Sequence, residues 1–325
     1  MRLESTRTAV TETLLEMAET DPNILLVCAD SVLVIRGRPF AERFPDRYFD
    51  VGIAEQDAVG CAAGLAACGF VPFVVTYAGF ISMRACEQVR TFVAYPGLPV
   101  KLVGANGGMA SGEREGVTHQ FFEDLGIMRA IPGITVVVPA DASQVREAIR
   151  AVARCDGPAY VRIGSGRDPA VFEPPAPPFV LGRARVLHEA GKEVALFGCG
   201  LILNRVLEAA GELEKRGVGA TVVEVHTLKP LDVETIAGVL AGCGAAVSVE
   251  DHNIIGGLGS AIAEVAAEEA PVPLVRLGLR DLYPRSGNPE ELLDTYHIGV
   301  TDIVESALRA IERKHRPVRA GRPKV

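Results

Sequence analysis

Short apolar runs alternate with longer amphipathic segments over the first half of the chain. The runs are rich in β-branched residues and end at turn-forming residues, which is typical of buried parallel strands. The longer segments repeat their apolar positions with helical spacing, and Ser5 and Thr6 precede the first of them, which extends to about residue 19. This alternation predicts a doubly wound α/β sheet. Strands are predicted at 23–30, 70–77, 99–105, 134–141 and 159–164, and helices after Glu55, at about 81–93 and at 142–154.

A proline-rich segment interrupts this rhythm at residues 164–182, GSGRDPAVFEPPAPPFVLG, which contain five prolines. Prolines at this density favour an extended linker. Beyond the linker the alternation of strands and helices restarts on a smaller scale. We therefore predict an α/β domain at 1–165, a linker at 166–182, a smaller α/β domain at 183–315 and a basic tail at 316–325.

The composition is that of an ordinary globular protein, with 325 residues, 48% hydrophobic and 23% charged, and a net charge of −8. An acidic chain is a poor partner for nucleic acid or for an anionic membrane, so we expect neither. Seven cysteines lie scattered without a CxxC pair, which is typical of buried thiols in a reducing compartment. Without an apolar segment that reads as a signal or a membrane span, the sequence predicts a cytoplasmic protein without a metal site of its own.

An acidic residue stands at an unusual place in RYFDVGIAEQ, residues 47–56. Glu55 is the second-last residue of this stretch, and the residues that follow it are almost all small. Burial among small apolar neighbours favours a protonated carboxyl, whereas the N-terminus of a helix favours the anion. A carboxyl that has to hold or share a proton here therefore requires a position from which water is excluded.

Three other side chains are candidates for chemistry. His119 is the first of six histidines and follows a glycine-rich, charged loop, where it is either a solvated loop residue or a proton carrier near neutral pH. Tyr77 and Phe80 lie three residues apart where a predicted strand becomes a helix. They either fill the core or form a wall on which a flat heteroaromatic ring stacks. GGLGSA, residues 256–261, is the nearest match to a dinucleotide loop and is better explained as a tight turn before a helix.

These stretches resemble one family when they are read in order. FDVGIAEQ, PFVVTYAGF, EGVTHQ, HTLKPLD (226–232) and VEDHNIIGGLGSA (249–261) are similar to motifs of the transketolase and deoxyxylulose-phosphate synthase family. The resemblance covers essentially the whole chain and implies a pyrimidine-binding domain followed by the family's C-terminal domain. It implies an enzyme that uses thiamine diphosphate and Mg²⁺ to transfer a two-carbon ketol unit from a ketose to an aldehyde.

The resemblance also implies roles around the cofactor. Glu55 matches the acid that hydrogen-bonds N1′ of the aminopyrimidine and so favours the tautomer that removes the thiazolium C2 proton. Tyr77 and Phe80 match the wall against that ring, and Asp30 matches a position near the cofactor. His119 matches the histidine that handles protons beside the substrate.

Three further matches concern the substrate. Glu115 matches an acid that contacts sugar hydroxyls, while Arg7 and Arg162 match arginines that hold a sugar phosphate. Either arginine could instead be an ordinary surface or sheet-end charge. Arg114 is an additional charge at the predicted pocket mouth, and the resemblance gives it no role.

Two departures from the family pattern change the expectation. No Gly-Asp-Gly motif for the metal and diphosphate occurs in this chain. We therefore expect the C-terminal subunit of a split transketolase, whose N-terminal partner subunit holds the diphosphate and most of the Mg²⁺ contacts in an α2β2 heterotetramer. Residues 105–112, ANGGMASG, lack a second substrate histidine, which suggests an unusual sugar or aldehyde.

Three other interpretations remain open at this point. The architecture is shared by the beta subunit of the decarboxylating component of 2-oxo-acid dehydrogenases. A 1-deoxyxylulose-5-phosphate synthase-like enzyme is another possibility, although that enzyme is normally one chain. A binding or regulatory protein could also retain the fold without the chemistry. His226 and His252 lie in strand-end turns and are predicted to be structural.

Overall fold

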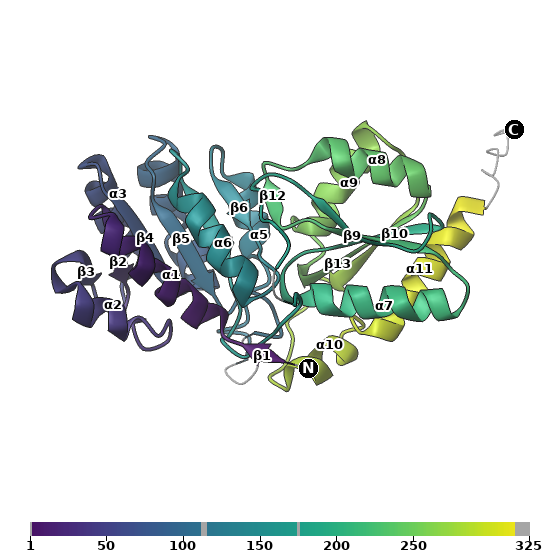
Figure 1. The fold of residues 1–325 in the computed structure, drawn as a ribbon, viewed down its shortest axis with the longest axis horizontal. Coiled ribbons are helices and arrows are strands. Elements are labelled where there is room, and N and C mark those ends of the chain that lie inside the picture. The colour runs from purple at the N-terminus through teal and green to yellow at the C-terminus, as the bar shows by residue number, and fades with distance from the viewer. Residues whose placement is uncertain (1, 112–115, 174–175, 316–325) are drawn as a thin grey trace, which may run out of the picture.

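Two α/β units lie side by side along the longest axis of the molecule (Figure 1). The computed structural model describes residues 2–111, 116–173 and 176–315, so the predicted basic tail lies outside the described part. The doubly wound α/β architecture predicted from the sequence is confirmed, with one large and one smaller sheet.

The first sheet has seven strands in the order β12-β6-β7-β5-β4-β2-β3. All neighbours are parallel except β12, which is antiparallel to β6. The strands in the middle of this sheet are largely apolar because helices cover both faces of the sheet. The bounds of the strands of this sheet are β2 (Ile24–Cys28), β3 (Tyr48–Asp50), β4 (Val71–Tyr77), β5 (Lys101–Ala105), β6 (Thr135–Val137), β7 (Ala159–Arg162) and β12 (Thr227–Lys229).

Helices pack on both faces of this sheet. Apolar residues of α1 (Thr6–Thr20), α2 (Arg38–Arg43) and α6 (Ala142–Ala153) join one buried cluster. Those of α3 (Glu55–Ala67) and α5 (Asp124–Ala130) join another on the opposite face. The Ser5 hydroxyl accepts a hydrogen bond from the Thr8 amide, so the predicted helix start is confirmed as an N-cap.

The segment predicted as one helix at 81–93 differs from the expectation. It consists of a π-helical segment at Phe80–Arg84, the short helix α4 (Cys86–Gln88) and a second π-helical segment at Val89–Ala94. A π-helical turn contains one more residue than an α-helical turn, and it changes which side chains share a face. The apolar spacing alone could not distinguish these forms.

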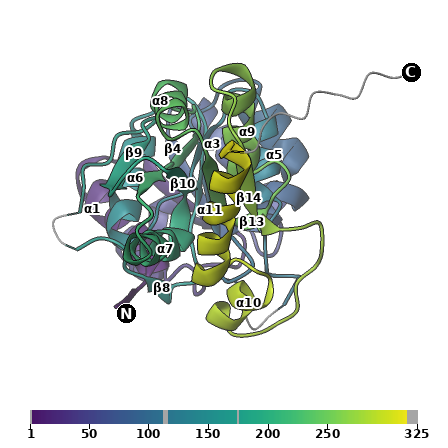
Figure 2. The ribbon, with the colours of Figure 1, turned by 90° about the vertical axis from the view of Figure 1, so that its right-hand side faces the viewer.

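The second sheet has five strands in the order β14-β13-β10-β11-β9, parallel except for β9 against β11. Figures 1 and 2 show α8 and α9 on one side of it and α7 and α11 on the other. The bounds are β9 (Arg185–Glu189), β10 (Val194–Gly198), β11 (Ala220–Glu224), β13 (Ala246–Asn253), β14 (Leu274–Leu279), α7 (Leu203–Lys215), α8 (Val233–Cys243), α9 (Leu258–Glu268), α10 (Pro289–Thr295) and α11 (Val300–His315).

The two halves are joined by more than the proline-rich segment. β12 comes from the second half yet extends the first sheet, and one buried apolar cluster contains residues of both halves. Within the predicted linker, β8 (Asp168–Pro169) pairs with β1 (Leu3–Glu4) near the N-terminus. The contacts between the domains therefore form a continuous packed core.

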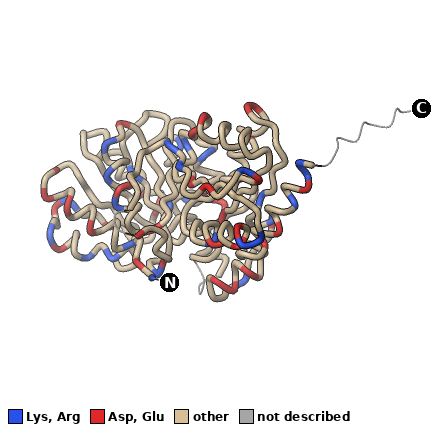
Figure 3. Tube along the Cα trace, turned by 45° about the vertical axis from the view of Figure 1, so that its right-hand side comes forward, with Lys and Arg blue, Asp and Glu red and all other residues tan. Residues whose placement is uncertain are grey.

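Acidic and basic residues are interspersed along the trace and do not separate by sign in the view of Figure 3. No helix within the described ranges is both long enough and apolar enough to span a lipid bilayer.

Candidate active site

Several predicted site residues follow the carboxyl ends of parallel strands in the first sheet. Such ends meet at one edge, where ligands bind in doubly wound folds. β3, β2, β4, β5 and β7 are neighbours in this order and run parallel. The selected residues at this edge are Asp30 after β2, Glu55 after β3, Tyr77 and Phe80 at and after the end of β4, and Arg162 at the end of β7.

Glu55 opens α3 and is buried, with 1% of its surface exposed. Its neighbours Ala58 and Val59 on the inner face of the helix are fully buried. Arg84 Nη1 lies 2.6 Å from Glu55 Oε2, while the Arg84 side chain is 45% exposed. The site therefore combines the burial that the sequence predicted with a counter-charge that it did not predict.

Arg84 is a site residue that the sequence analysis missed. Its guanidinium carbon lies 4.2 Å from the centre of the Phe80 ring, within cation–π range. It also ends the first π-helical segment, and π-helical turns occur often at functional sites. The sequence offered no signal for the pairing, because Arg84 and Glu55 are 29 residues apart and meet through the fold.

Four rings from two separate segments form an aromatic cluster. Tyr77 and Phe80 have ring centres 5.5 Å apart, and the His119 ring lies 5.1 Å from Tyr77 and 5.3 Å from Phe80. Phe121, which the sequence analysis did not select, lies 5.3 Å from Phe80. The structure thus brings the loop histidine against the two aromatic residues at the end of β4.

Close approach of the two segments depends on Gly79. A Cβ at this position would lie 1.8 Å from the Phe121 ring. A glycine between Tyr77 and Phe80 therefore lets the Phe121 ring pack directly against the backbone of this segment.

His119 is half-buried in the loop that follows β5. Its amide donates to the carbonyl of Gly116 over 2.9 Å, and its Nδ1 lies 3.0 Å from the Thr118 hydroxyl. The hydrogen bond at Nδ1 orients the ring, so Nε2 is the ring nitrogen that could contact a bound molecule. This arrangement suits an imidazole that exchanges a proton with a bound molecule.

Asp30 is exposed in a turn after β2, with φ at +53°. Its amide donates to Asp50, which also accepts from the Tyr48 hydroxyl and the Gly52 amide. Burial opposes ionisation, but these three hydrogen bonds outweigh it and hold the pKa of Asp50 below its ordinary value. The Asp50 carboxylate thereby connects the turn of Asp30 to the turn that leads into Glu55.

Arg7 reaches the same edge from the first turn of α1. Its Nη1 donates to the carbonyl of Val34 over 3.1 Å, and its Nη2 donates to the side chain of Asn106, which follows β5. The predicted contact of Arg7 with a sugar phosphate remains a prediction.

Arg162 is buried between the two domains, with 6% of its surface exposed. Its Nη2 donates to the carbonyls of Phe121 and Asp251 over 3.0 and 2.8 Å, and its Nε lies 3.1 Å from Asp124 Oδ2. Burial alone would lower the pKa of Arg162, but the carboxylates of Asp124 and Asp251 outweigh it and raise that pKa. Its predicted phosphate contact remains a prediction, and its observed partners are protein groups.

Two residues of the predicted pocket, Arg114 and Glu115, lie outside the described residues. Within the described ranges, no three His, Cys, Asp or Glu side chains are grouped closely enough to hold a metal ion.

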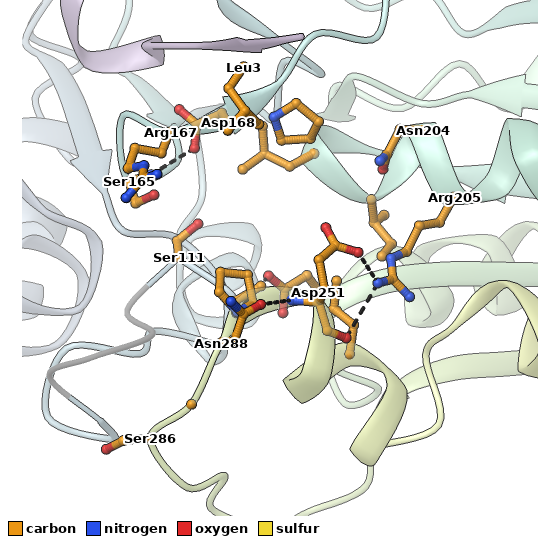
Figure 4. Close-up of a pocket in the computed structure, with 18 residues that line it drawn as sticks. Leu3, Ser111, Ser165, Arg167, Asp168, Asn204, Arg205, Asp251, Ser286 and Asn288 are labelled. Atoms are coloured by element: carbon orange, nitrogen blue, oxygen red, sulfur yellow. Dashed lines mark hydrogen bonds and ion pairs between the residues drawn. The ribbon is translucent and has the colours of Figure 1, made fainter. Parts of the chain in front are cut away.

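A separate cavity of about 780 Å³ lies between the domains (Figure 4). Its charged groups largely satisfy one another: Arg205 pairs with Glu290 and Asp294, and Asp168 accepts hydrogen bonds from Thr6 and from backbone amides. The described residues that line this cavity do not include Glu55 or the aromatic cluster. The candidate active site is therefore the sheet edge and not this cavity.

Comparisons with known proteins agree with this geometry. Residues 4–166 match the family model of the transketolase pyrimidine binding domain, and residues 182–303 match that of the transketolase C-terminal domain. The chain belongs to the transketolase family. This membership implies a transketolase-type enzymatic role and dependence on thiamine diphosphate.

Relatives of matching length are subunits of split transketolases. The 6-deoxy-6-sulfo-D-fructose transketolase subunit SqwH of Clostridium sp. (strain MSTE9) is 41% identical, with 95% of each chain covered. An apulose-4-phosphate transketolase subunit of Phocaeicola vulgatus is 35% identical over 94% of this chain and 97% of its own. A solved split gene transketolase, described as an inactive beta4 tetramer, superposes with a TM-score of 0.87 and 39% identity over 96% of this chain and 99% of that chain. 1-Deoxy-D-xylulose-5-phosphate synthases match over about half of their own length.

Proposed function

We propose that this chain is the C-terminal subunit of a two-chain transketolase, which transfers a two-carbon ketol unit from a ketose donor to an aldehyde acceptor. The observation that carries the proposal is the buried Glu55 carboxylate next to the aromatic cluster at the carboxyl edge of the first sheet. The lengths of the split-transketolase relatives support it, because each is covered almost completely by this chain.

The residues present at this edge suit one half of a thiamine diphosphate site. Tyr77 and Phe80 would hold the aminopyrimidine ring, and Glu55 would hydrogen-bond its N1′. Asp30 lies on the neighbouring turn and would border the cofactor. When bound, thiamine diphosphate supplies a nucleophilic carbon and an electron sink for cleavage of the bond beside a carbonyl.

Glu55 has to hold or share a proton at N1′ for this role. Its carboxyl group is buried and is paired with the Arg84 guanidinium. Arg84 is partly exposed at the surface of the site. A docked subunit would therefore change the solvation of its guanidinium and the strength of its ion pair with Glu55 Oε2. We propose that His119 then exchanges a proton with the substrate, since its ring already lies beside the aromatic wall.

A partner subunit would cover exposed apolar side chains beside Glu55 and along the helical segment that follows β4. Ile53 is 75% exposed just before Glu55, and Tyr95 is 88% exposed at the end of the π-helical region. Met83 and Phe92, between them in the same region, are each nearly half exposed. Exposed large apolar side chains of this kind favour a protein interface. We propose that the N-terminal subunit docks here, holds the diphosphate and most of the Mg²⁺ contacts, and completes an α2β2 heterotetramer.

We propose that the donor is a sugar with an anionic end. One relative is named for a sulfonated fructose and another for a sugar phosphate. Arg7 stands at the sheet edge beside Asn106 and would bind such an anion with its planar guanidinium. The predicted roles of Arg162 and of Glu115, toward the phosphate and the sugar hydroxyls, belong to the same proposal.

Calorimetric titration of thiamine diphosphate with Mg²⁺ tests the division of the site between two chains. We expect weak binding to this chain alone and tight binding to its mixture with a subunit that carries the diphosphate-binding domain. Tight binding by this chain alone would contradict the split site. Turnover of pyruvate in place of ketose–aldehyde pairs would contradict the transketolase reaction.

The variant Glu55→Gln tests the catalytic assignment in the assembled enzyme. The amide keeps the size of the side chain and cannot transfer a proton in the same way, so we expect the ketol transfer rate to fall by about 10²- to 10⁴-fold. Assembly with the partner should persist, as size-exclusion chromatography would show. Full activity of this variant would falsify the role of Glu55.

A further inference from the structure

Strand β13 of the second domain ends against the loop that carries His119. Asp251, near the end of this strand, is buried, with 8% of its surface exposed. Its Oδ1 accepts from the Met109 amide over 2.8 Å, and its Oδ2 accepts from the Ala110 amide over 3.2 Å. The carboxylate of one domain thus satisfies two consecutive backbone donors of the other.

The loop backbone is shaped to receive this carboxylate. Gly108 has φ at +106°, and a Cβ at this position would lie 2.1 Å from Asp251 Oδ2. A side chain at 108 would therefore displace the carboxylate as well as strain the backbone. The Gly108 amide in turn donates to the carbonyl of Phe121 over 2.7 Å, which closes the base of the loop.

The other end of the loop is bound by the same strand. The Asn253 amide donates to the carbonyl of Phe122 over 2.8 Å. Arg162 joins this end of the loop to the strand, because one nitrogen, Nη2, donates to the carbonyls of both Phe121 and Asp251. Most of these contacts are buried, so each unmade hydrogen bond among them would leave a desolvated polar group, which is unfavourable.

These contacts lie next to the aromatic cluster. Phe121, whose carbonyl is held by Gly108 and Arg162, places its ring 5.3 Å from Phe80 and 6.3 Å from His119. His119 lies between the two bound ends of the loop and packs against Tyr77 and Phe80. Movement of the loop base would therefore move the imidazole relative to the aromatic wall.

We infer that Asp251 is a positioning residue, through which the C-terminal domain sets the place of His119 in the active site. This inference rests on the proposed function. It means that the C-terminal domain contributes to turnover through Asp251, although Asp251 does not touch the reacting atoms. Loss of one carboxylate oxygen should loosen the loop base and slow the proton transfer that His119 performs. Glu55, Tyr77 and Phe80 lie on other segments, which Asp251 does not hydrogen-bond, so cofactor binding should persist.

The test compares Asp251→Asn with Asp232→Asn as a matched control. Asp232 is also buried in the C-terminal domain and also accepts from two backbone amides, those of Ala184 and Thr235, but at the start of α8. Both variants retain one acceptor oxygen and lose the charge. A general loss of stability would affect both in the same way.

Hydrogen exchange of this chain alone is the first measurement, because it does not depend on the proposed reaction. In Asp251→Asn we expect faster exchange in peptides that cover residues 107–110 and 116–122, and no change there in Asp232→Asn. Unchanged exchange in the Asp251 variant would overturn the inference, whatever the enzyme does.

Kinetics of the assembled enzyme with partner subunit, thiamine diphosphate and Mg²⁺ are the second measurement. We expect Asp251→Asn to lower kcat by about tenfold or more and to leave cofactor affinity within about twofold, while Asp232→Asn keeps the wild-type kcat. Faster exchange with an unchanged kcat would overturn the positioning role. If the wild-type assembly shows no ketol transfer at all, the proposed function fails, and the exchange result still decides whether Asp251 holds the loop.

Discussion

At the scale of single residues, the pair of Glu55 and Arg84 governs the candidate site. The carboxylate is nearly inaccessible, whereas the guanidinium is partly in water and stacks on Phe80. Removing one member of such a pair leaves an uncompensated buried charge, which costs more than the pair itself contributes. The two side chains should therefore behave as a coupled unit and not as independent contacts.

The variant Arg84→Met tests this coupling. We expect the free energy of unfolding to fall by about 1–3 kcal/mol, since Glu55 loses its counter-charge inside a buried site. Adding Glu55→Gln to this variant should recover part of the loss, because the neutral amide no longer needs the guanidinium. Urea unfolding of the wild type, both single variants and the double variant measures the interaction energy. Strictly additive effects would show that the contact does not contribute to stability.

At the scale of secondary-structure elements, glycines determine where segments approach closely. Glu250 accepts from the amides of Leu258 and Gly259 at the start of α9, and a Cβ at Gly257 would lie 2.0 Å from its Oε2. GGLGSA is therefore a turn that allows a buried carboxylate to cap a helix, as the sequence analysis predicted for the turn itself. Burial raises the pKa of Glu250 to about 7, against the opposing effect of these hydrogen bonds.

Gly79 provides the test at this scale. We expect Gly79→Ala to destabilise the protein by about 1–3 kcal/mol, because the methyl group would overlap the Phe121 ring and push it out of the aromatic cluster. The control is Gly64→Ala in α3, where a Cβ would meet no atom within 4 Å. That change should stabilise the helix by about 0.5–1 kcal/mol. Thermal unfolding of both variants distinguishes a steric effect from a general effect of alanine, and equal shifts would exclude the steric explanation.

At the scale of the whole molecule, buried histidines link the second domain to the first. His226 is buried just before β12 and packs against the ring of Phe179 at 4.2 Å between ring centres. Burial, with a smaller contribution from Arg185, lowers the pKa of His226 from 6.5 to about 4. Because the unfolded chain binds a proton more readily in this range, His226 opposes folding increasingly as the pH falls from about 6.5 toward 4.

The variant His226→Asn should remove this dependence. Between pH 7 and pH 4, the wild type should lose on the order of 3 kcal/mol of stability relative to the variant. His297→Asn is the control, because that imidazole is 84% exposed in the same domain. The free energy of unfolding, measured at several pH values, gives the difference. Parallel pH curves for wild type and His226→Asn would contradict the assignment.

Most elements could be predicted from the sequence because each apolar run and each helical repeat is a local pattern. The central strands of the first sheet and the capped start of α1 follow from such patterns. The π-helical region at 80–94 could not be predicted, because apolar spacing does not distinguish one extra residue per turn. Likewise, β12 pairs with β6 although the two segments are about 90 residues apart in the sequence. Local sequence patterns cannot predict such a pairing.

Some residues of the candidate site could likewise be predicted from the sequence, and others could not. Glu55, Tyr77, Phe80 and His119 could be selected from the sequence, because their residue types and ordered motifs carry chemical meaning without coordinates. Arg84, Phe121 and Asp251 could not, since each acts through a partner that is distant along the chain. The sequence by itself determined the family, the order of the domains and the principal candidates for chemistry. The tertiary structure decided which charges neutralise one another and which strand holds the loop of His119, because contacts between segments far apart in the sequence form only in the folded chain.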